Sequence, residues 1–95
     1  MTTVKIIFKS KPLKFLKRTQ GYINKTQCEE LIIKAVRKII LKTDENVDLK
    51  RMRDTEQKVY RVRYKKVRII FRVINEKIII LAIIEKVGFR KDVYK

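Results

Sequence analysis

The segment VYRVRYKKVRIIFRV, residues 59–73, carries arginines at positions that alternate as in β-strands. If residues 65–66 form a two-residue hairpin turn, Arg63 lies directly opposite Arg68, and Arg61 shares their face of the sheet. Two opposed arginines destabilise a hairpin by roughly 0.2–1 kcal/mol, and the segment contains no carboxylate to separate them. The pattern favours an anion site. Phosphate suits it, because guanidinium groups match its oxygens in geometry and stay charged.

A second interpretation of these arginines stays open, because long basic side chains on an exposed strand also discourage aggregation. The C-terminal tail adds Arg90 and Tyr94, which follow the last apolar segment and could fold back beside the hairpin. A tyrosine surrounded by arginines could have a lowered pKa and accept a proton. Spacing alone favours the simpler alternative, in which Tyr94 packs the C-terminus against the sheet.

The composition narrows the chemistry that the chain can perform. A net charge of +16 and an isoelectric point near 10.3 favour nucleic acid, or else an acidic protein, as the partner. The absence of histidine excludes the usual Cys/His zinc site and histidine-based catalysis. With Gly21 and Gly88 as the only glycines, no glycine-rich phosphate loop is present. We expect no metal and no cofactor.

Two further features concern the compartment in which the protein works. The single Cys28 cannot form an internal disulfide, which suits a reducing compartment, and we expect it to pack in the core. No apolar stretch is long enough for a membrane span, and the first residues lack the order of a signal peptide. We therefore expect a soluble, cytoplasmic protein.

The spacing of apolar residues predicts a single α+β domain, residues 1–95, with the order β-α-α-β-β-β. The first helix is predicted to start with Ser10 as N-cap and to stop at Gly21, and the second to start with a capping box at Thr26 and Glu29. Apolar strand IIILAII is expected to be buried on both faces in the middle of a largely antiparallel sheet. The predicted strands cover residues 4–8, 59–64, 67–74 and 78–87, with a brief strand possible near 47–50.

The C-terminal third resembles the RelE/ParE superfamily of toxin–antitoxin toxins. The family pattern is a Y-R-x-R strand, a hairpin, a second-strand arginine and a closing (H/K)-R-x-x-V-Y, and here it reads VYRVRYKKVRIIFRV followed by VGFRKDVYK. The first strand and helix, VKIIFKSKPLKFLKR, are also similar. The chain departs from the family in its Lys65-Lys66 turn, in Phe89 before the closing arginine, and in arginines at 61 and 63 where some members have lysines.

The resemblance implies a ribosome-dependent endoribonuclease that cuts mRNA in the A site of the small subunit, through attack of a 2′-hydroxyl on the adjacent phosphate. Four arginines are then expected to hold the phosphate, and Tyr94 to transfer a proton. The expected catalytic residues are Arg61, Arg63, Arg68, Arg90 and Tyr94, and the expected RNA-binding residues are Lys50, Arg51, Lys65 and Lys66.

The resemblance also implies a partner, a cognate antitoxin of the RelB or ParD kind. We expect it to contact the two predicted helices through their apolar stripe. Two other functions remain open. A ParE-like toxin would inhibit DNA gyrase instead of cutting RNA, and a non-catalytic basic module would bind nucleic acid without using Tyr94.

Overall fold

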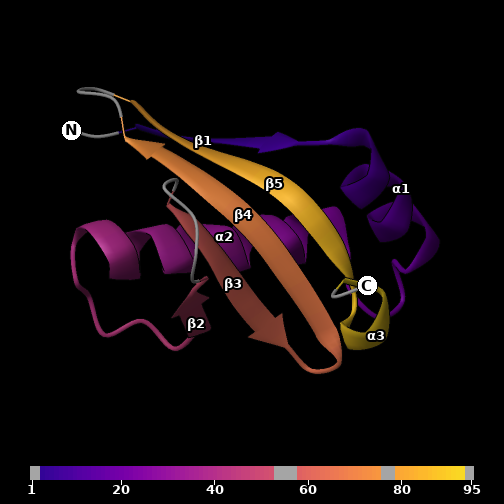
Figure 1. Cartoon of the computed structure of the whole chain (residues 1–95). Helices are drawn as coiled ribbons and strands as arrows, with labels where there is room; N and C mark the ends of the chain where they lie inside the picture. The colour runs from indigo at the N-terminus through magenta and orange to yellow at the C-terminus, as the bar shows by residue number, and fades with distance from the viewer. Residues whose placement is uncertain (1–2, 53–57, 76–78, 94–95) are drawn as a thin grey trace.

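The computed structural model describes residues 3–52, 58–75 and 79–93 of the chain. A five-stranded sheet carries helix α2 across one face, while α1 and the short α3 lie at one end of it (Figure 1). This α+β arrangement confirms the predicted class. The elements are β1 (Thr3–Phe8), α1 (Ser10–Arg18), α2 (Lys25–Ile40), β2 (Asp48–Arg51), β3 (Val59–Tyr64), β4 (Val67–Asn75), β5 (Ile79–Phe89) and α3 (Arg90–Val93).

The strands are ordered β1-β5-β4-β3-β2, and all neighbours are antiparallel except β1 and β5. The apolar strand β5 therefore lies inside the sheet, as predicted. Its burial alternates, however, with Ile80, Ala82 and Ile84 buried and Leu81 and Ile83 only partly so. The prediction that both faces are buried is wrong, because helix α2 covers one face and none of the helices among the described residues covers the opposite face (Figure 1).

The β3–β4 hairpin has the predicted register. Arg63 pairs with Arg68, and Arg61 pairs with Ile70, on the face opposite α2. The predicted inner face is also confirmed, because its apolar side chains lie in the core. These are Val62, Val67, Ile69 and Phe71, with Tyr60 stacked on the ring of Phe71 at a centroid distance of 5.8 Å.

Helix α1 begins one residue earlier than predicted. Lys9 is its N-cap, in extended backbone conformation and without a side-chain cap, so the prediction of Ser10 as the cap is wrong. The helix ends at Arg18, where the Thr19 hydroxyl donates to the carbonyl oxygen of Phe15 at 2.9 Å. Phe15 and Leu16 are buried, and this fixes α1 against the end of β5.

Helix α2 also starts at a different capping box from the predicted one. The Asn24 side chain accepts a hydrogen bond from the Gln27 amide at 2.8 Å, and the Gln27 side chain accepts one from the Asn24 amide at 3.0 Å. The helix buries its apolar stripe against the sheet, with Cys28, Ile32, Ala35 and Val36 in the core. Because most of the stripe is used inside the protein, it no longer supports the expected antitoxin interface on the helices.

The capping box predicts a local cost for losing Asn24. Asn24→Ala should lower the free energy of unfolding by about 1 kcal/mol, because it leaves a backbone amide of the first turn without its acceptor. Thr26→Ala, at an exposed position two residues further on in the same turn, should change it by no more than about 0.5 kcal/mol. Urea denaturation measures both, and equal losses in the two variants would contradict this cap.

Cys28, in the first turn of α2, is buried in the core, and burial, with a smaller effect of Glu29, raises the pKa of its thiol to about 12. The native thiol is therefore protonated near pH 8, and a disulfide reagent should label it far more slowly than in the urea-unfolded chain.

The same burial makes the stability depend on pH. The unfolded thiol loses its proton at a lower pH than the native thiol, so the free energy of unfolding should fall as the pH rises from about 9 towards 12. Cys28→Ala should lack this component of the pH dependence. Native labelling at the unfolded rate would contradict the burial.

Candidate phosphate-binding site

The Arg68 side chain stabilises the turn of the β3–β4 hairpin through hydrogen bonds to its backbone. Its Nη1 donates hydrogen bonds to the carbonyl oxygens of Lys65 at 2.9 Å and of Val67 at 3.1 Å. The residue is only 7% exposed. Within the described part of the chain, neither its Nε nor its Nη2 has an acceptor. A buried guanidinium is costly unless it is paired, so Arg68 retains donors that an anion would satisfy.

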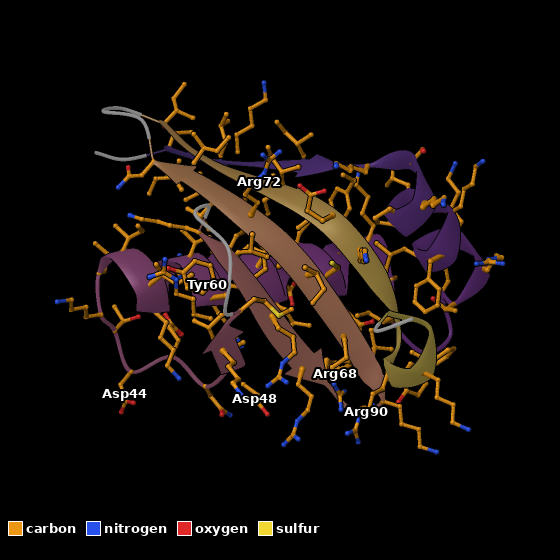
Figure 2. All side chains as sticks on the ribbon, viewed as in Figure 1. Asp44, Asp48, Tyr60, Arg68, Arg72 and Arg90 are labelled. Carbon is orange, nitrogen blue, oxygen red and sulfur yellow. The ribbon has the colours of Figure 1, made fainter. Side chains whose placement is uncertain are left out.

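Two other segments fasten the same turn. The amide of Arg90, the first residue of α3, donates to the carbonyl oxygen of Lys66 at 3.1 Å. The amide of Lys66 donates to the hydroxyl of Tyr22, in the loop before α2, at 3.2 Å. The C-terminal tail is therefore tied to the hairpin, as the sequence predicted for Arg90. Figure 2 shows the Arg68 and Arg90 side chains projecting at the same end of the sheet.

Lys65 occupies a strained position in the turn. Its φ is +54°, in the left-handed region, where a residue with a Cβ is disfavoured. Its Nζ lies 5.6 Å from the ring centroid of Tyr22 and 5.2 Å from that of Tyr64, which places the charge over two aromatic faces. A positive charge is thus kept where glycine or asparagine would fit the backbone better, and such strain is frequent at functional sites.

These side chains surround a cavity of about 590 Å³ at the end of the sheet. Five of its six lining residues are cationic, and among the described ion pairs none joins a carboxylate to any of them. So many like charges in one concavity attract an anion. The lining residues are Lys65, Lys66, Arg68, Phe89, Arg90 and Lys91.

The β3 arginines have a partner that the sequence analysis did not foresee. Arg63 Nε lies 2.7 Å from Asp48 Oδ2, and Arg61 Nη2 lies 4.0 Å from Asp48 Oδ1. No carboxylate lies between Arg63 and Arg68 in the hairpin, but β2 pairs with β3 and brings Asp48 opposite Arg63 on the side of β3 away from β4. Arg63 remains the cross-strand neighbour of Arg68. Arg61 is farther from the turn, and its buried Nε has no hydrogen-bond partner among the described residues.

The other predicted site residues fall into two groups, those that line the cavity and those that do not. Lys65 and Lys66 line the cavity with Arg68 and Arg90, whereas Lys50 and Arg51 do not. Lys50 and Arg51 lie on the edge strand β2, opposite Arg61 and Tyr60, on the far side of β3. Tyr94 lies outside the described residues. Lys91 was missed; it follows Arg90 directly, and only the fold of the tail brings it to the cavity.

Two classes of site receive no support from the geometry. No group of three or more metal-ligating side chains occurs in the described ranges. No helix formed by those ranges is long and apolar enough to cross a membrane. The basic cavity, by its five cations, suits the phosphates of a nucleic acid.

Comparison with known proteins gives one family. The ParE toxin of type II toxin–antitoxin systems, parDE, matches the chain over residues 6–86. No curated protein matches the chain. Among solved structures, the crystal structure of the RelB-RelE antitoxin-toxin complex from Methanococcus jannaschii is similar, with 13% identity and a TM-score of 0.49, covering 93% of this chain and 94% of the other.

Asp48 should compete with an anion for the β3 arginines. Asp48→Asn should tighten binding of single-stranded RNA by about 1.4- to fivefold, because an exposed ion pair of this kind is worth only about 0.2–1 kcal/mol. Asp44→Asn removes the same charge from an exposed carboxylate that lies apart from the arginines (Figure 2), and it should have a smaller effect. Fluorescence anisotropy with labelled RNA measures both. Equal gains in the two variants would show that only net charge matters.

Proposed function

The chain belongs to the ParE toxin family of type II toxin–antitoxin systems, and we propose that it is a toxin that cleaves messenger RNA on the ribosome. One observation carries the proposal: a buried arginine with unused donors lies in a cavity with four other cations and no described ion pair. An RNA phosphate has the charge and the oxygen geometry that this site lacks. A ribosomal target places the protein in the cytoplasm.

The proposed reaction needs no metal. The 2′-hydroxyl of a nucleotide attacks its own 3′-phosphate, so that the O2′–P bond forms and the P–O5′ bond breaks. The products are a cyclic phosphate and a 5′-hydroxyl, whose oxygen takes a proton from water. Arg68 and Arg90 hold the phosphate and stabilise the charge that develops on its oxygens. Arg63, beside Arg68, and Arg61 add positive potential along β3.

Tyr94 is the proposed general base in this reaction. It lies four residues after Arg90 in the sequence, and Arg90 begins the helix that leads from the cavity. A guanidinium group stabilises a phenolate, which is the form of a tyrosine side chain that accepts a 2′ proton. The chain has no histidine to take that role.

Inhibition of DNA gyrase is the second candidate function, and the match to the ParE family favours it. Such a toxin acts by binding and needs no general base. The two candidates differ in what Tyr94 does, because loss of its hydroxyl should matter to cleavage and not to gyrase inhibition.

The proposed partner is an acidic antitoxin of the RelB or ParD kind. Two observations support it: membership of a toxin–antitoxin family and a net charge of +16. A protein that carries carboxylates to the cavity would neutralise its cations and block RNA in a single event.

Expression of the wild type beside two variants tests the nuclease. Arg90→Ala and Tyr94→Phe should each reduce cleavage of translated messages by about 100-fold or more, because each removes a group that acts on the transition state. Mapping of 5′ ends on translated messages measures the cuts, which should be phased to codons. Arg37→Ala, which removes an α2 arginine already paired with Glu45, should leave the cuts unchanged.

Arg68 needs a more careful variant, because its hydrogen bonds also hold the turn. Arg68→Lys keeps the charge but not the forked geometry, so it should lose cleavage while thermal unfolding shows a folded protein. Growth arrest with intact messages and with broken or relaxed DNA would instead establish gyrase inhibition. Unchanged cleavage by Tyr94→Phe would remove Tyr94 from the mechanism.

A further inference from the structure

Phe89 is an aromatic residue that the proposed reaction does not use. It ends strand β5, is 38% exposed, and belongs to the lining of the phosphate cavity. Its ring meets Phe15 at a centroid distance of 5.5 Å and Tyr22 at 5.9 Å, with interplanar angles of 78° and 63°. Both contacts are edge-to-face, and among the described residues no ring is stacked parallel on it. Phe89 is therefore held in place but remains partly open to solvent.

Phe89 also lines a second cavity. Its volume is about 870 Å³, and Phe15, Val87 and Phe89 give it an apolar floor. Helix α1 supplies a basic rim to which no described ion pair contributes a carboxylate. The rim cations are Lys11, Lys14, Lys17 and Arg18. Phe89 thus lines two basic cavities.

We propose that Phe89 is a stacking platform for an unpaired RNA base, with the strand running from the phosphate cavity onto the basic face of α1. Single-stranded nucleic acids are bound by this combination of aromatic faces and cations along the backbone. A paired base cannot stack in this way, so the platform selects single-stranded RNA. This inference rests on the proposed function and adds the residue that positions the nucleotide next to the reacting phosphate.

A structural role for Phe89 makes a different prediction. If the ring only packs α1 against β5, a substitution should lower stability, and any loss of RNA binding should follow the loss of folded protein. If the ring stacks on a base, affinity should fall without a matching fall in stability, and another aromatic residue should restore it.

The test uses a single-stranded 2′-O-methyl RNA, which the protein cannot cleave, with 2-aminopurine as a reporter of stacking. An oligonucleotide of roughly eight nucleotides matches the usual site size. The wild type should bind it and quench the fluorescence. Phe89→Leu should weaken binding by about 5- to 100-fold and remove the quenching. Phe89→Tyr should retain both affinity and quenching.

Phe8→Leu is the matched control. The Phe8 ring is partly buried under the Lys25 ammonium, 5.6 Å from its centroid, and lines neither cavity. The Phe8→Leu variant should bind RNA with the affinity of the wild type. Thermal unfolding of all variants checks the fold, and a loss of binding that parallels a loss of stability in both Phe89 variants would overturn the platform.

The stacking inference and the proposed function can fail separately. If Arg90→Ala weakens RNA binding while Phe89→Leu keeps wild-type affinity and quenching, the platform is wrong and the phosphate site stands. If the wild type does not bind single-stranded RNA, the proposed function fails and the platform with it. Tighter binding of a single-stranded DNA of the same sequence would overturn RNA as the ligand.

Discussion

The turn between β3 and β4 is the constraint on which the site depends. Arg68 donates to two carbonyl oxygens there, α3 donates to a third, and Tyr22 accepts from the amide of Lys66. These bonds join the hairpin, the C-terminal helix and the loop before α2 at one end of the sheet. They also draw like charges together, which repel unless an anion lies between them. The hydrogen bonds that fix the turn therefore also bring together the residues that line the cavity.

The described carboxylates that form ion pairs are unevenly placed in the molecule. The described acidic side chains in ion pairs lie away from the cavity: Asp48 with the β3 arginines, Glu85 with Lys9 and Arg72, and Glu45 with Arg37. Arg61, Arg63 and Arg72 on the sheet therefore have carboxylate partners, whereas the five cations of the cavity have none among the described ion pairs. A uniformly basic surface would not show this difference, and an aromatic ring at the centre of the unbalanced region suits a nucleic acid better than a small anion.

The hairpin register could be predicted from the sequence because a two-residue turn and alternating apolar residues allow only one alignment. The residue at which helix α2 starts was harder to predict, because two local patterns in the sequence are equivalent. Thr26 with Glu29 and Asn24 with Gln27 both have the spacing of a capping box, and the residue at which the helix starts decides between them. Asp48 was missed for a different reason, since its position opposite Arg63 depends on the pairing of distant strands. The role of Phe89 likewise required α1 and β5 in three dimensions.

The most direct test of the central claim is a titration of isotope-labelled protein with non-cleavable single-stranded RNA, followed by NMR chemical shifts. The account predicts that the largest early shifts occur at the hairpin end, at Lys66, Arg68, Phe89 and Arg90, and that they weaken with added salt. Shifts confined to the uncovered sheet face around the exposed Ile7 and Ile79, with the hairpin end unchanged, would contradict it.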